Sequence, residues 1–131
     1  MLDFDPDYEG AFPYRQITEA IIGAAFEVHN ELGYGFLHRV YQHALQVELA
    51  RRNYRADLEK RINVRYKEVI VGDYDADLIV EDCMLIESKI APRCDKRDEA
   101  QLLNLLKATG VKIGILINFG WSKVEYRRLI Y

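Results

Sequence analysis

Acidic residues and a lysine alternate along two short segments in the middle of the chain. Asp75 and Asp77 stand two residues apart in the first segment, and Glu87 and Lys89 stand two residues apart in the second. Successive side chains of a β-strand point to opposite faces, so a spacing of two places both members of each pair on one face. The sequence therefore predicts two polar strand faces that carry three carboxylates and an ammonium group.

The two segments predict a β-hairpin, because Tyr74–Val80 and Met84–Ile90 are rich in apolar and β-branched residues and only residues 81–83 separate them. A three-residue loop pairs the last residue of the first strand with the first residue of the second. Counting back from that pair places Asp77 directly opposite Glu87.

The same register places Asp75 opposite Lys89. Because alternation along each strand preserves the face, all four side chains are expected on a single patch, with Ser88 pointing the other way. Two opposed carboxylates with Cβ atoms about 5 Å apart repel each other unless a proton or a cation lies between them.

A divalent metal ion suits such a carboxylate pair. Mg²⁺, or Mn²⁺ in its place, takes hard oxygen ligands and keeps several waters, so Asp77 and Glu87 would be sufficient protein ligands. Lys89 would hold the attacking water or a phosphate oxygen as a point charge. An ordinary salt-bridge network, with Asp75 bound to Lys89 and Asp77 bound to an arginine, fits the same spacing and stays open as an alternative.

Two further polar residues are candidates for the same patch. His38 and Tyr41 are one helical turn apart, and His38 is either a ligand or general base over the sheet or a histidine packed on a helix face. Gln101, in an expected third helix, would orient a water or contact phosphate, or else it faces solvent. Near the carboxyl end, Phe119, Trp121 and Tyr126 form either a packed apolar cluster or a surface on which bases stack.

Helices are expected on both sides of these strands. Apolar residues recur at helical spacing from Ile17 to a stop at Gly33, with Thr18 as a candidate N-cap, and again from Leu37 to about Asn53. A third helix is predicted from Lys96 to Thr109 and ends at Gly110. The remaining predicted strands are Tyr54–Leu58, Arg61–Tyr66, Glu68–Val71 and Lys112–Asn118, and Ser122–Tyr131 is compatible with either a helix or a strand.

The order of elements indicates an α/β (α+β) domain in which helices flank a central mixed sheet, with the order α-α-β-β-β-β-α-β. We assign residues 1–15 to an irregular arm and residues 16–131 to one domain, because 131 residues are enough for a single core. The net charge of −3 argues against binding to DNA by bulk electrostatics. Cys83 and Cys94 are expected to be free thiols, and no apolar run or signal sequence indicates a membrane or secretion, so the cytoplasm is the expected location.

Four segments of the chain resemble the GxxExxY family, which is placed in the PD-(D/E)XK nuclease superfamily. They are AAFEVHNELGYGFL, ADLIVEDCMLIESK, EAQLLNLLKATG and IGILINF, in the family's order and within Ile17–Phe119. The resemblance implies a restriction-endonuclease-like core. It also implies that Asp77 is the metal-binding aspartate, that Glu87 and Lys89 form the E-x-K element, and that Gln101 is a polar position in the following helix.

The chain departs from the family signature at one position, since Gly35 and Tyr41 are present but His38 stands where glutamate is expected. The resemblance implies a Mg²⁺- or Mn²⁺-dependent phosphodiesterase that acts on nucleic acid, more readily DNA than RNA. Imidazole suits Mn²⁺ better than Mg²⁺, so the second interpretation is a catalytically degenerate module that binds nucleic acid or a protein. The oligomeric state is left open, with a homodimer as one arrangement.

Overall fold

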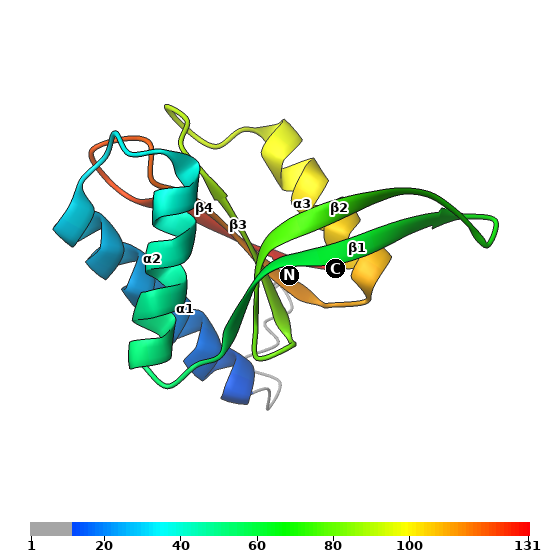
Figure 1. Cartoon of the computed structure of the whole chain (residues 1–131), viewed down its shortest axis with the longest axis horizontal. Coiled ribbons are helices and arrows are strands. Elements are labelled where there is room, and N and C mark those ends of the chain that lie inside the picture. The colour runs from blue at the N-terminus through cyan, green and yellow to red at the C-terminus, as the bar shows by residue number, and fades with distance from the viewer. Residues whose placement is uncertain (1–11) are drawn as a thin grey trace, which may run out of the picture.

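The computed structural model describes residues 12–131, which form three helices and five strands (Figure 1). In chain order these elements are α1 (Phe12–Leu32), α2 (His38–Arg51), β1 (Ala56–Tyr66), β2 (Val69–Val80), β3 (Met84–Lys89), α3 (Lys96–Thr109), β4 (Ile113–Asn118) and β5 (Glu125–Ile130). No helix in this part of the chain is long and apolar enough to cross a membrane.

All five strands belong to one sheet with the order β1-β2-β3-β4-β5. Neighbouring strands are antiparallel except β3 and β4, which are parallel because α3 carries the chain from one to the other. The predicted mixed sheet with flanking helices is confirmed. The carboxyl-terminal segment, which the sequence did not decide, forms the edge strand β5.

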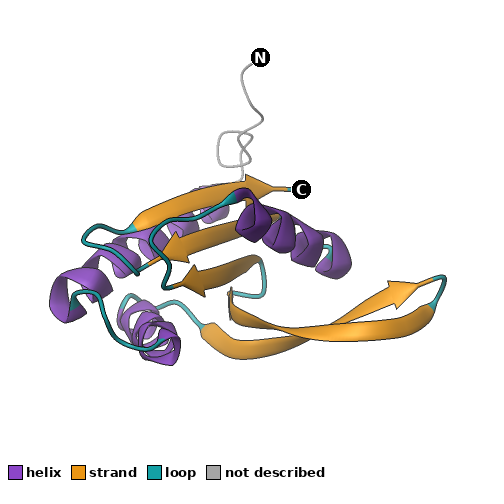
Figure 2. Ribbon diagram, turned by 90° about the horizontal axis from the view of Figure 1, so that it is seen from above, coloured by secondary structure: helices purple, strands orange, loops and turns teal. Residues whose placement is uncertain are grey.

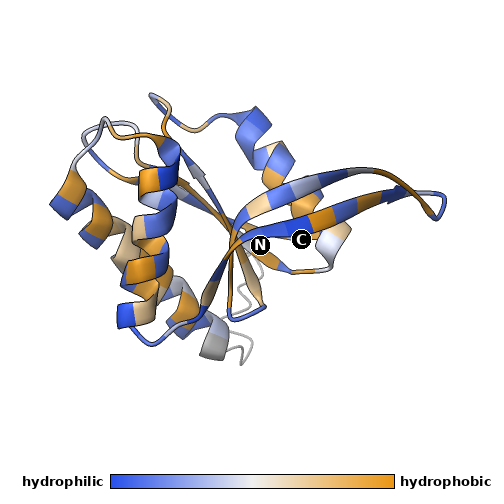
Figure 3. Cartoon of the chain, viewed as in Figure 1, coloured by the Kyte–Doolittle hydropathy of each residue, from blue (hydrophilic) through white to orange (hydrophobic). Residues whose placement is uncertain are grey.

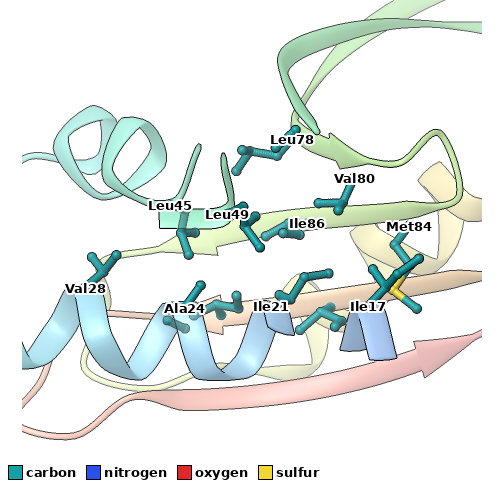
Figure 4. Packing of buried hydrophobic residues seen from close by; sticks show 14 of the residues in the cluster. Ile17, Ile21, Ala24, Val28, Leu45, Leu49, Leu78, Val80, Met84 and Ile86 are labelled. Atoms are coloured by element: carbon teal, nitrogen blue, oxygen red, sulfur yellow. The ribbon is translucent and has the colours of Figure 1, made fainter. Parts of the chain in front are cut away.

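The two faces of the sheet carry separate apolar clusters. Along β2, Leu78 and Val80 point to one face and Ile79 to the other. On the first face α1 and α2 pack against the strands through Ile21, Ala24, Leu45, Leu49, Leu78, Val80, Met84 and Ile86 (Figure 4). On the second face α3 packs through Leu102, Leu105 and Leu106. Hydrophobic and hydrophilic residues alternate along α1 and α2 in Figure 3, as expected for helices that bury one side.

Two helix ends agree with the sequence and one helix start does not. Gly33 and Gly110 have φ angles of 70° and 77° and follow α1 and α3, as their sequence positions predict. Helix α1 already includes Phe12–Leu32, so Thr18 is not its N-cap. Instead, the Thr18 hydroxyl donates to the Tyr14 carbonyl oxygen at 2.6 Å, a bond that a mid-helix threonine can make. Residues 12–15 of the predicted irregular arm are therefore helical, and its residues 1–11 lie outside the described part of the chain.

The segments predicted as three short strands between Tyr54 and Val71 form two long ones instead. Strands β1 and β2 continue to a two-residue turn at Lys67 and Glu68, and together they form a hairpin whose tip extends beyond the helices (Figure 2). Both turn residues have positive φ angles, 48° and 70°, which is the geometry of a tight hairpin turn. Neither residue is a glycine or an asparagine, so the usual sequence signal of this turn is missing. Cys83 and Cys94 are free, as expected.

Candidate metal centre

The candidate site lies where β2 and β3 separate. These strands pair over Val80↔Met84, Ile79↔Leu85 and Leu78↔Ile86, which confirms the predicted register of the hairpin. Their pairing then stops, while β3 continues along β4 and β2 continues along β1. Asp77, which precedes Leu78, and Glu87, which follows Ile86, would form the next pair. They stand at the point where the strands diverge and form no backbone ladder bonds with each other's strand.

Side chains replace the missing ladder bonds. The Asp77 backbone N–H donates to Glu87 Oε1 at 3.2 Å, and the Ser88 backbone N–H donates to Asp77 Oδ2 at 2.7 Å. Each carboxylate thus satisfies a backbone donor that the separating strands would otherwise leave unpaired. Both acidic side chains are consequently directed into the gap between the two strands.

His38, in the first turn of α2, lies over this gap. Its Nε2 atom is 3.0 Å from Asp77 Oδ2 and 2.9 Å from Ser88 Oγ, and the Ser88 hydroxyl also donates to Asp77 Oδ2 at 3.0 Å. The structure therefore brings His38 to the carboxylate pair. Ser88 points to the opposite face of β3 from Glu87 and Lys89, as expected. It still contacts Asp77, because Asp77 does not stay on the expected face but reaches between the strands to the side that Ser88 shares with α2.

Lys89 lies on the α3 side of β3, as Glu87 does by strand alternation. Its ammonium group forms an ion pair with Asp98 Oδ1 at 3.3 Å. Asp98 belongs to the capping box at the start of α3, where its side chain also accepts from the Asp95 backbone N–H. The first turn of α3 therefore holds Lys89 beside the site, a role for Asp98 that its position in the sequence did not reveal.

Asp75 does not belong to the site. It pairs across the β1–β2 hairpin with Arg61, whose Nε donates to Asp75 Oδ1 at 3.2 Å. The predicted contact between Asp75 and Lys89 is wrong because β2 has already left β3 at this point. The patch consequently contains two carboxylates instead of three.

Burial and charge separate the pKa values of the three central groups. The pKa of Glu87 is raised to about 7, first by burial and then by the nearby charge of Asp77. Burial would also raise the pKa of Asp77, but hydrogen bonds from His38 and from the Ser88 backbone outweigh it and hold that pKa below its ordinary value. The hydrogen bond to Asp77 raises the pKa of His38. The contact between His38 and Asp77 therefore favours the charged forms of both groups, while burial favours the protonated form of Glu87.

The donor set fits a hard divalent cation. Asp77 uses Oδ2 and Glu87 uses Oε1 for the hydrogen bonds above, and no described residue donates a hydrogen bond to Asp77 Oδ1 or Glu87 Oε2. Among residues 12–131 no group of three or more His, Cys, Asp or Glu side chains is arranged to hold a metal. Two carboxylates suit Mg²⁺, which keeps several of its own waters, better than a metal that needs a full set of protein ligands.

Gln101 forms no hydrogen bond with either carboxylate of the pair. It is exposed on α3, one turn beyond Asp98, and forms no hydrogen bond with the described residues. A different glutamine was missed: the buried Gln42 donates from Nε2 to the Asp77 carbonyl oxygen at 3.0 Å. Gln42 follows His38 by four residues, so the helical spacing already placed both residues on one face of α2.

The comparisons with known proteins agree with this architecture. No curated protein and no solved structure matches the chain significantly. A family model described as the PD-(D/E)XK nuclease superfamily matches residues 15–129, a range that contains α2, β2, β3 and α3 in full. The chain therefore belongs to the PD-(D/E)XK nuclease superfamily.

Proposed function

We propose that this protein hydrolyses phosphodiester bonds in nucleic acid, preferentially DNA, with Mg²⁺ or Mn²⁺ bound by Asp77 and Glu87. The observation that carries the proposal is the convergence of these two carboxylates in the gap between β2 and β3, with Lys89 two residues beyond Glu87. The motif that names the superfamily fits the same positions. Asp77 would correspond to the aspartate of the motif, and Ala76 precedes it where the motif has proline. Glu87-Ser88-Lys89 would correspond to (D/E)XK.

Each residue has a distinct part in this proposal. Asp77 and Glu87 would hold the ion through the oxygens that accept no hydrogen bond from the described chain. A bound Mg²⁺ would activate water and offset the charge that develops on the phosphate. Lys89, held by Asp98, donates to the water or to a phosphate oxygen as a compact positive charge.

We further propose that the chain is a member of the GxxExxY group with a substituted signature. His38 occupies the place of the signature glutamate and lies 3.0 Å from Asp77, where a carboxylate would be a third oxygen ligand. The signature tyrosine, Tyr41, is fully buried, and its hydroxyl donates to the Gly33 carbonyl oxygen at 2.6 Å. The glutamate position thus belongs to the site, and the tyrosine position supports the loop that leads to it.

A panel of labelled nucleic acids tests the proposed function directly. Single-stranded, duplex and branched DNA and the corresponding RNAs are incubated with the protein and Mg²⁺, Mn²⁺ or EDTA, and the products are separated by size. We expect cleavage with at least one metal and none with EDTA. Cleavage that persists in EDTA, or no cleavage of any substrate, would contradict the proposal.

The second candidate function is a degenerate module that binds nucleic acid or protein without hydrolysis. The contact between His38 and Asp77 favours it, because an imidazole whose pKa is raised lies beside the aspartate, where a bound cation would otherwise be expected. In that case, Mg²⁺ should not raise the melting temperature, and nucleic-acid binding should be the same with and without metal. Salt-dependent binding without cleavage would then separate nucleic-acid binding from a protein-binding role.

Replacing His38 by glutamate should increase Mg²⁺-dependent cleavage, by about tenfold if the carboxylate adds roughly 1.4 kcal/mol of ion binding. The reason is that carboxylate oxygen is a better ligand for Mg²⁺ than imidazole nitrogen. Cleavage rates of His38→Glu and wild type are compared across a Mg²⁺ titration, with His38→Gln as the uncharged control. A wild-type protein that is already as active at low Mg²⁺ would show that the glutamate is dispensable.

A further inference from the structure

Large apolar side chains are exposed on three segments that meet beside the candidate site. They are Tyr34, Phe36 and Leu37 between α1 and α2, Ile90 directly after β3, and Trp121 between β4 and β5. Leu37, Trp121 and Tyr34 are 72%, 59% and 57% exposed. We call these five residues the aromatic rim. A contiguous exposed apolar patch often marks a surface that binds a ligand or a partner.

The rim lies next to the candidate site, because two of its residues adjoin site residues in the sequence. Leu37 precedes His38, and Ile90 follows Lys89. The loop that carries Trp121 is packed on the segment after β3, since a Cβ atom at Gly120 would lie 2.5 Å from the backbone of Ala91. In Figure 1 these loops gather at the same end of the sheet. A molecule that contacts the rim would therefore reach the site.

Buried groups hold the rim in place. The Tyr41 hydroxyl donates to the Gly33 carbonyl oxygen and accepts from the Phe36 backbone N–H at 3.3 Å. The buried His29 contacts the Trp121 carbonyl oxygen through Nε2 at 2.7 Å. The rings of Tyr34 and Trp121 lie 5.9 Å apart between centroids. Because the loops are anchored before any ligand arrives, binding on these rings costs little conformational entropy.

Three exposed cations lie within a few residues of the rim along the chain. Arg39, Arg93 and Lys123 are exposed, and none of them forms an ion pair with a residue of the described chain. Rings that stack on bases, together with cations that contact phosphates, are the usual surface for an unpaired strand.

We propose that the aromatic rim binds an unpaired segment of nucleic acid next to the cleavage site, with bases stacked on Tyr34 and Trp121 and phosphates held by the three cations. This inference deepens the proposed function and takes nucleic acid as the ligand from it. In a duplex the base faces are already covered by neighbouring bases, so exposed rings offer it little. The preferred substrate is accordingly single-stranded or locally unpaired.

Trp121 is the only tryptophan in the chain, so its fluorescence reports on the rim directly. The protein is titrated in EDTA with a ten-nucleotide thymidine strand and with a duplex of equal length, which separates binding from hydrolysis. We expect the single strand to quench the fluorescence of Trp121 and the duplex to leave that fluorescence nearly unchanged.

Tyr34→Ala should weaken single-strand binding about tenfold, within the range for one stacked base. Tyr66→Ala, which removes an equally exposed ring at the tip of the β1–β2 hairpin, is the matched control.

Replacing Arg39, Arg93 and Lys123 together by alanine should reduce the salt dependence of binding by about two counterions, whereas Tyr34→Ala should leave it unchanged. Equal quenching by the duplex, no quenching at low salt, or unchanged affinity of Tyr34→Ala would overturn the inference. Quenching without cleavage in the substrate panel would support single-strand binding at the rim and contradict the proposed nuclease function. Cleavage without quenching would support the nuclease function and contradict binding at the rim.

Discussion

Replacing Lys89 by alanine should lower the rate of hydrolysis by about 10²- to 10³-fold, the effect of removing one donor aimed at the charge of a transition state. Lys89 contacts neither Asp77 nor Glu87 directly, and the ion pair that holds it is with Asp98. The loss should therefore appear in turnover while Mg²⁺ still binds. Cleavage rates are measured at saturating Mg²⁺, and Mg²⁺ binding is followed by the rise in melting temperature.

Two controls distinguish a role in turnover from loss of metal or of fold. Asp77→Asn should lose activity together with most of its Mg²⁺-dependent rise in melting temperature, because it removes a ligand charge. Lys112→Ala removes an exposed lysine away from the pair and should keep wild-type activity. If Lys89→Ala cleaves as fast as wild type, or loses Mg²⁺ binding as fully as Asp77→Asn, Lys89 does not act on water or phosphate.

The sequence was sufficient for the parts of the fold that depend on local signals. The hairpin around residues 81–83 has the predicted register because a short loop between two apolar strands leaves little choice. Helix α3 has the predicted bounds because an aspartate cap begins it and Gly110 ends it. The placement of His38 over the carboxylates also followed from helical spacing together with the family resemblance.

The arrangement inside the site did not follow from the sequence, because it depends on where two strands stop pairing. Strand alternation assumes a regular ladder, and it therefore placed Asp75 and Asp77 on one face with Glu87 and Lys89, away from Ser88. The ladder between β1 and β2 omits the pair of Glu59 and Asp77, and Glu59 has a φ of 51°. Asp77 is thus released from regular pairing on both sides. No residue type near it signals this irregularity, which is stabilised by side-chain contacts from β3 and from the more distant α2.

The geometry that suits a metal should also make the folded protein less stable when no metal is bound. Glu87 is 9% exposed, and its nearest charged carboxylate is the one it would share an ion with. A buried acid beside a second acid is destabilising unless a proton or a cation neutralises it. The same feature that supports metal binding should therefore be measurable as a pH-dependent loss of stability.

Replacing Glu87 by glutamine should stabilise the metal-free protein at alkaline pH and abolish hydrolysis. The folded pKa of about 7 exceeds the ordinary 4.5, so between these values the folded state binds more protons than the unfolded state. Stability in the wild type then falls as pH rises from about 4.5 through about 7, and the difference between the two pKa values corresponds to at most roughly 3 kcal/mol. Glutamine keeps an acceptor for the Asp77 backbone N–H but does not titrate. The free energy of unfolding of Glu87→Gln should therefore lack the part of the decline with pH that comes from Glu87.

Free energies of unfolding are measured in urea at pH 5 and pH 8.5, with and without Mg²⁺. Mg²⁺ should restore stability to the wild type at pH 8.5 and not to Glu87→Gln, whereas parallel pH profiles for the two proteins would show that Glu87 is not the buried acid that the ion neutralises.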